Sequence, residues 1–114
     1  MAHTLDRTPL NKTAPAPPSP AAAAAEKAAQ WLQQASEYEA FADTLTDHTL
    51  KIAYRDLAKD LRARADRVKT QPVRAALDIA EAARIRKAGA ASTDPATRHE
   101  FNAAADAIER GETR

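Results

Sequence analysis

The stretch YEAFADTLTDHTLKIAYRDLAKDL, residues 38–61, decides the fold because it recurs in outline as IRKAGAASTDPATRHEFNAAADAI, residues 85–108. Each copy reads as the end of one helix, a short corner and the start of a second helix. The corners are Thr46-Asp47 and Thr93-Asp94. Two such units predict an all-α protein in which four helices form a body of two helical hairpins.

Apolar residues at three- and four-residue steps, together with Pro and capping residues, set the predicted helix positions. Hairpin one should cover 21–70, with a first helix that begins near Ser19 or Pro20, capped by Ser19, and a second helix over about 48–70. Hairpin two should cover 72–111, and together the hairpins form a helical bundle over 21–111.

Thr46 and Asp47 offer a cap for the second helix and Asp94 offers one for the fourth, because their side-chain oxygens can accept hydrogen bonds from the unpaired amides there. The third helix should run from about 72 to 88, with Thr70 or Gln71 as its cap. Both glycines are predicted to end helices: Gly89 with a left-handed stop, and Gly111 after the fourth helix.

The first twenty residues predict a disordered arm rich in Pro and Ala. Five of the seven prolines fall there, among Ala, Thr and Ser, and proline favours extended backbone without a core. The arm has no charged start followed by an apolar run, so we expect no secretory signal. The apolar run Ala21 to Ala25 is too short to cross a bilayer, so we expect no membrane partner.

Composition predicts a helical protein with a thin interior. The chain has 114 residues, two glycines and a formal net charge of +1, and alanine occupies many positions where a core would need larger side chains. A monomer with so few large apolar residues is expected to be marginally stable unless close packing through alanine or self-association adds to it. The chain has no cysteine, which excludes disulfides and thiolate metal sites and is compatible with a cytoplasmic location.

No catalytic, cofactor or metal site is expected. The bundle di-iron motif Glu-x-x-His is missing, and Glu39 is the one carboxylate near the apolar stripe of the first helix that is worth considering as a ligand. The three histidines read as surface residues without a relay partner. The pairs Asp60–Arg64 and Asp56–Lys59 read as ordinary pairs on a helix surface.

Charge placement is the strongest hint of function. Residues 51–87 hold eleven Lys and Arg against five Asp and Glu, a balance of +6, while the rest of the chain sums to −5. On the second helix five cations fall within an arc of about 80° and define a basic stripe: Lys51, Arg55, Lys59, Arg62 and Lys69. The stripe could be a solvated face, bind an acidic protein surface or bind nucleic acid, although no aromatic residue is interleaved with it.

Trp31 and Tyr38 share one face of the first helix. Core packing is their default role, but any part of that face left uncovered would serve as an aromatic anchor for an interface.

The run Tyr38 to Asp47, followed by Leu50, Leu57-Ala58 and Leu61 to Ala65, resembles a widespread type of small bacterial helical-hairpin protein without assigned chemistry. Thr93-Asp94-Pro95 to Ala105 is similar. The resemblance implies a bundle and no activity. The helix lengths are also remotely similar to ferritin-like hairpins, whose metal ligands are missing here.

These observations together predict a small non-catalytic interaction or scaffold module that binds a protein partner or forms a homo-oligomer. Nucleic-acid binding through the basic stripe is the first alternative. A degenerate ferritin-like metal protein is the second.

Overall fold

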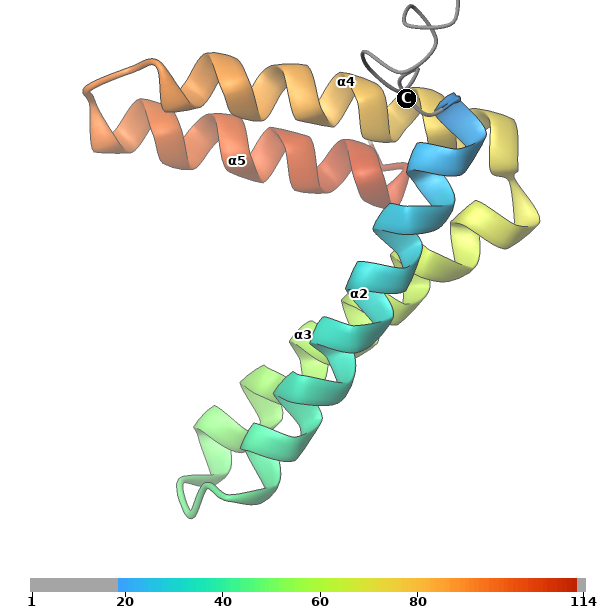
Figure 1. Cartoon of the computed structure of the whole chain (residues 1–114). Coiled ribbons are helices and arrows are strands. Elements are labelled where there is room, and N and C mark those ends of the chain that lie inside the picture. The colour runs from blue at the N-terminus through green and yellow to red at the C-terminus, as the bar shows by residue number, and fades with distance from the viewer. Residues whose placement is uncertain (1–18, 113–114) are drawn as a thin grey trace, which may run out of the picture.

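The computed structural model describes residues 19–112, and four helices account for nearly all of them. They are α2 (Pro20–Asp43), α3 (His48–Thr70), α4 (Pro72–Ala90) and α5 (Pro95–Arg110). Helices α2 and α3 form one antiparallel hairpin, and α4 and α5 form the other (Figure 1). The predicted all-α fold of two helical hairpins is confirmed, and there is no strand between residues 19 and 112.

The N-termini of three helices are capped as the sequence predicts. Ser19 Oγ accepts a hydrogen bond from the Ala22 amide at 3.1 Å, and Asp47 Oδ1 accepts one from Leu50 at 3.2 Å. Asp94 accepts from the Ala96 amide and from the Thr97 hydroxyl. The Thr97 hydrogen bond, aided by the amide, holds the pKa of Asp94 below its ordinary value.

The two glycines differ in role. Gly111 follows α5 in the left-handed conformation, with φ of 81°, so the predicted stop is confirmed. The predicted stop at Gly89 is wrong, because α4 continues through Gly89 to Ala90. A Cβ atom at Gly89 would lie only 2.6 Å from the Cβ atom of Phe101, so glycine is needed there for close approach of α4 and α5.

The cap of α4 is also weaker than its neighbours. Gln71 occupies the N-cap position, but its side chain makes no capping hydrogen bond. Pro72 instead supplies the start of the helix, since its fixed φ suits the first helical position and it has no amide to satisfy.

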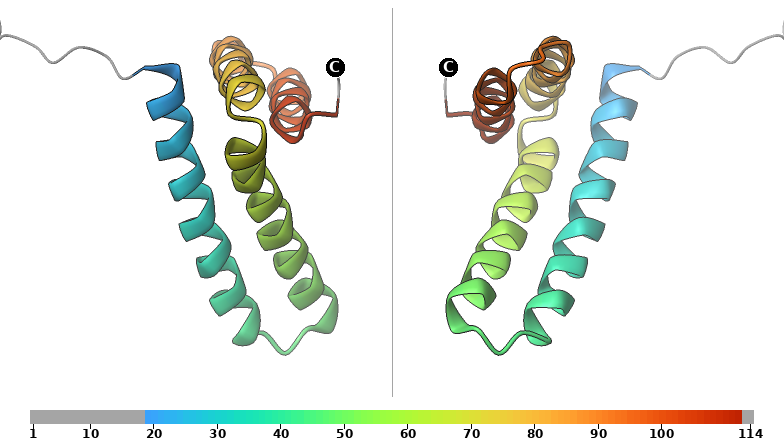
Figure 2. Two further views of the ribbon diagram at one scale, coloured as in Figure 1. Left: turned by 90° about the vertical axis from the view of Figure 1, so that its right-hand side faces the viewer. Right: turned by 90° about the vertical axis from the view of Figure 1, so that its left-hand side faces the viewer.

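The two hairpins meet only near the connection between α3 and α4. We call this region the elbow. From the elbow the second hairpin projects away from one face of the first, and the far ends of the two hairpins diverge (Figures 1 and 2). Most packing is therefore within each hairpin, and fewer residues of α2 and α3 contact α4 or α5. This arrangement leaves much of each hairpin without a second layer.

The interior is thin and made mainly of alanine. Nine of the twelve buried apolar residues are Ala, and the three large ones are Trp31, Leu61 and Ile108. One cluster joins Trp31 and Leu61 to Ala35, Ala58 and Ala65, with Ile79 of α4 packed against it. The expectation of a thin interior is thus confirmed, since eight large apolar side chains between residues 19 and 112 remain exposed.

The predicted arm over residues 1–20 lies almost wholly outside the described residues. Its last two residues, Ser19 and Pro20, belong to the start of α2. Within the described part of the chain, none of the helices combines the length and the apolar character needed to cross a membrane.

Candidate interaction surfaces

A cluster of charged side chains joins the first hairpin to α5 at the elbow. The Arg64 guanidinium of α3 donates to Asp60 on its own helix and reaches across to Glu109 at 2.9 Å and Asp106 at 3.4 Å. Arg86 of α4 donates to the same two carboxylates, at 2.5 and 2.8 Å to Glu109 and 2.5 Å to Asp106. Two arginines and two carboxylates from three helices therefore fix this junction.

Burial makes this junction different from a surface ion pair. The side chains of Arg64 and Glu109 are 8% and 1% exposed. The hydrogen bonds that Arg86 donates to Glu109, followed by the one that it donates to Asp106, raise the pKa of Arg86. Arg64 also lies 5.9 Å from the ring of Trp31, so the cation contacts the apolar cluster as well as the carboxylates. The prediction that Asp60–Arg64 is an ordinary surface pair is wrong, because Arg64 is a buried bridge.

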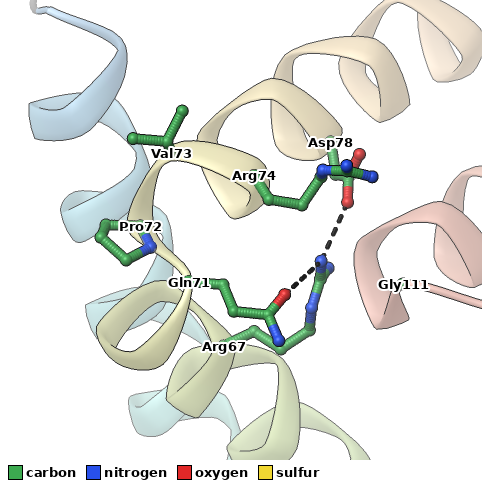
Figure 3. A pocket seen from close by; sticks show the side chains of 7 residues that line it. All are labelled: Arg67, Gln71, Pro72, Val73, Arg74, Asp78 and Gly111. Carbon is green, nitrogen blue, oxygen red and sulfur yellow. Dashed lines mark hydrogen bonds and ion pairs between the residues drawn. The ribbon is translucent and has the colours of Figure 1, made fainter.

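A second link at the elbow is centred on Arg67. Its guanidinium donates to Asp78 of α4 at 3.0 Å, to the backbone carbonyl of Glu109 at 2.9 Å and to Gln71 at 3.4 Å. The Asp78 side chain is 1% exposed. Figure 3 shows Arg67 reaching from α3 towards Asp78 across the open depression lined by Gln71, Pro72 and Arg74. This depression, about 490 Å³, is therefore part of the joint between the hairpins.

Two kinds of contact distinguish the two edges of the first hairpin. Along one edge, carboxylates of α2 pair with cations of α3: Asp43 with Arg55 at 3.2 Å, and Glu39 with Arg62 through two hydrogen bonds. The pKa of Glu39 is lowered by its hydrogen bond with Arg62, and that of Arg62 is raised in return. Glu39, the carboxylate considered as a metal ligand, is thus an ion-pair partner.

The basic stripe follows this ion-paired edge. Arg55 and Arg62 are engaged by α2, whereas the three lysines form no ion pair within the described residues: Lys51, Lys59 and Lys69. Two of the five cations are therefore largely neutralised by their own chain. The charge that the stripe can offer to a phosphate backbone or an acidic surface is lower than the sequence alone indicates.

Aromatic and leucine side chains mark the opposite edge and define the outer apolar face of the first hairpin. Tyr54 of α3 packs against Phe41 of α2 edge-on at 4.9 Å and against Tyr38 at 5.8 Å. Leu50 and Leu57 lie on the same flank of α3, because seven residues nearly complete two helical turns. Phe41, Leu50 and Leu57 are each almost half exposed, at 47%, 48% and 46%.

The second hairpin contacts the first at the end of this flank that is nearest the elbow. Arg64 follows Leu57 by seven residues, so it shares the flank of the two leucines, and it binds Glu109 of α5. Helix α5 therefore covers the flank near the elbow and leaves the part nearer the Thr44–Asp47 corner open, in the angle between the hairpins (Figure 1).

Trp31 and Tyr38 fall in different environments. Trp31 is 4% exposed and belongs to the buried cluster, so its default role as a core residue accounts for its position. Tyr38 is half-buried and extends the cluster onto the outer apolar face. Of the two, Tyr38 alone is accessible to a partner.

Another apolar surface lies at the outside of the elbow. The first turns of α2 and α4 form a groove of about 400 Å³ lined by Pro20, Ala21, Pro72, Val73 and Leu77, among others. Val73 is 75% exposed. The groove is separate from the outer apolar face, since its residues come from the opposite end of α2.

Sequence reasoning missed the buried charges at the elbow. Glu109 lies one turn from Ala105 on the apolar side of α5, and Arg64 lies between Leu61 and Ala65 on α3. A charged residue inside an apolar stripe is the sequence feature that could have predicted these buried charges. It was not decisive, because each of these residues is also compatible with an exposed position on a helix surface. Between residues 19 and 112, no group of three His, Asp or Glu side chains is arranged to hold a metal ion.

Comparison with known proteins does not assign this chain to a family. No family model matches this chain, and neither a curated protein nor a solved structure matches it. The similarity to small bacterial helical-hairpin proteins therefore stays a prediction.

Proposed function

We propose that this protein is a non-catalytic helical interaction module that associates with a second copy of itself. One observation carries the proposal: large apolar side chains are exposed more often than buried. Between residues 19 and 112, eight of them are at least 36% exposed, against three that are buried. Single exposed leucines are ordinary, but a surplus of this kind in hairpins that largely lack a second layer supports surfaces that another chain covers.

The charged groups support a structural role rather than catalysis. The most buried carboxylates, Glu109 and Asp78, are engaged by arginines, and both therefore act in joining helices. A general acid or base needs access to a substrate atom within hydrogen-bond reach. These carboxylates are oriented into the joint between the hairpins instead.

Nucleic-acid binding is the weaker candidate, because Arg55 and Arg62 of the basic stripe are paired with carboxylates of α2. Such binding would require competition with these internal pairs.

Sedimentation velocity or light scattering on the full chain tests the proposal. We expect the mean mass to rise from that of one 12.3-kDa chain towards that of two as the concentration increases from about 5 to about 300 μM. A mass that stays at one chain across this range would reject self-association.

A further inference from the structure

We propose that two copies pair through the outer apolar face of the first hairpin, Tyr38, Phe41, Leu50, Tyr54 and Leu57, to form an intermolecular four-helix bundle. This inference rests on the proposed self-association and specifies its surface. The α2–α3 hairpin of one copy would lie antiparallel against that of the other, related by a two-fold axis.

The chemistry of the face suits a second copy of this chain. A two-fold contact places the same patch opposite itself, so any net charge at its centre repels its own image. The five residues of the outer apolar face carry no charge at neutral pH, and the two tyrosines add hydroxyl groups that can hydrogen-bond across the contact. The opposite edge, which carries Lys51, Lys59 and Lys69, would place cations against cations in such a contact.

The arrangement of the hairpins leaves room for this pairing. The second hairpin projects from the elbow end of the first (Figures 1 and 2). The residues of the outer apolar face lie nearer the Thr44–Asp47 corner along α2 and α3. A two-fold axis through the outer face would overlap the two hairpins only along their outer halves. Each second hairpin would then lie beyond the corner of the partner copy, so the two need not collide.

The size of the face indicates a weak dimer. Ten residues of helix span about 15 Å and two packed helices about 20 Å, which gives roughly 300 Å² in projection. This is the size of the largest apolar patch on many monomers, and such patches are often functional. Two such faces together amount to roughly 600 Å² in projection, below the roughly 1,000 Å² of a stable specific interface, so we expect a weak dimer with a dissociation constant of roughly 10–100 μM.

The test compares two matched double variants with the wild type in sedimentation experiments. Leu50→Glu/Leu57→Glu places charges in the outer apolar face, and we expect its dissociation constant to rise at least about a hundredfold. Val73→Glu/Leu77→Glu makes the same change in the elbow groove, and we expect it to dimerise as the wild type does. Far-ultraviolet circular dichroism checks that each variant is helical.

The outcomes separate the surface from the function. If the wild type dimerises and the Leu50→Glu/Leu57→Glu variant still does, the outer apolar face is excluded while self-association stands. If the Val73→Glu/Leu77→Glu variant alone becomes monomeric, the elbow groove is the interface and this inference is overturned. A monomeric wild type rejects both proposals.

A second measurement decides the matter if the glutamate variant unfolds. The natural chain has no cysteine, so a single Ala53→Cys or Leu57→Cys substitution gives one thiol on the face-bearing flank of α3. Oxidation at about 50 μM protein should yield disulfide-linked dimers of at least one of these variants. Lys59→Cys, on the opposite flank, is the control. Equal cross-linking of all three variants, or cross-linking of Lys59→Cys alone, would contradict the pairing.

Discussion

Replacing Glu109 by Gln tests whether the buried charges hold the two hairpins together. The substitution keeps the shape of the side chain and removes its charge. The carboxylate accepts one hydrogen bond from Arg64 at 2.9 Å and two from Arg86 at 2.5 and 2.8 Å, and its side chain is 1% exposed. A glutamine has one acceptor oxygen with two lone pairs, so it can accept at most two of these three hydrogen bonds, and its NH2 group replaces an oxygen that accepts from a guanidinium.

The expected loss of stability follows from these contacts. Hydrogen bonds to charged groups contribute about 1.5–3 kcal/mol and neutral ones about 0.5–1.5 kcal/mol. Breaking a buried ion pair by removing one partner costs about 3–5 kcal/mol, but here Asp60 and Asp106 still neutralise Arg64. We therefore expect Glu109→Gln to lower the free energy of unfolding by about 2–4 kcal/mol, a large fraction of the stability of a small domain.

Asp106→Asn is the matched control. Asp106 lies on the same helix and binds the same two arginines, Arg64 and Arg86, but its side chain is 40% exposed. Solvent screening should limit the cost of its neutralisation to about 1 kcal/mol or less. The two variants thus differ in burial while sharing their partners.

Urea denaturation at one fixed protein concentration measures both variants. The single tryptophan, Trp31, is a suitable fluorescent probe, because it is buried and lies beside Arg64. Circular dichroism should give coincident transitions. If Glu109→Gln costs less than about 1 kcal/mol, or no more than Asp106→Asn, the ion pairs do not hold the elbow and the reasoning fails.

Three further substitutions test other parts of the structure. In urea denaturation, Gly89→Ala should lower the free energy of unfolding by about 1–2 kcal/mol, because the new methyl group meets Phe101. This loss should occur although alanine has the better helix propensity. An unchanged or higher stability would contradict the close approach of α4 and α5. The pKa of Asp94 is lower in the folded state than in the unfolded state, so its stabilising effect is present above the unfolded pKa and is lost as pH falls through the folded pKa. The melting temperature of Asp94→Asn should therefore depend less on pH in this acidic range than that of the wild type. An equal dependence would rule out this role of the cap. Mobility-shift assays on duplex and single-stranded DNA at low and moderate salt should show no DNA binding that depends on Lys51, Lys59 and Lys69. A salt-sensitive shift that disappears when these lysines are replaced by Glu would support nucleic-acid binding instead.

The helices were predictable because their signals are local. Ser19, Asp47 and Asp94 each cap the helix that follows, and each makes its hydrogen bond to an amide two or three residues away. Gly111 ends α5 for an equally local reason, its left-handed backbone. Interactions over such short separations depend on neighbouring residues alone, so a single sequence contains the information needed to place them.

The elbow was not predictable because its contacts join distant parts of the chain. Arg64 and Glu109 are 45 residues apart, and each carries a charge that by default predicts exposure. The prediction for Gly89 was wrong for a related reason. Its local position suggests a helix end, but the approach of Phe101 from α5 determines its role. The angle between the hairpins depends on these long-range contacts and has no local signature.

The chemistry of the elbow bears on the availability of the outer apolar face. Apolar contact is non-directional, so a joint made only of leucines would let the second hairpin settle onto any exposed apolar surface, including Phe41 and Leu57. Hydrogen bonds from planar guanidinium groups require particular directions. Arg64 binds Glu109 of α5, and Arg67 binds Asp78 of α4, through such bonds at the inner end of the first hairpin. Because Glu109 and Asp78 belong to the second hairpin, moving that hairpin outwards would break their buried ion pairs with Arg64 and Arg67. The ion pairs therefore keep the second hairpin away from the face that we assign to the second copy.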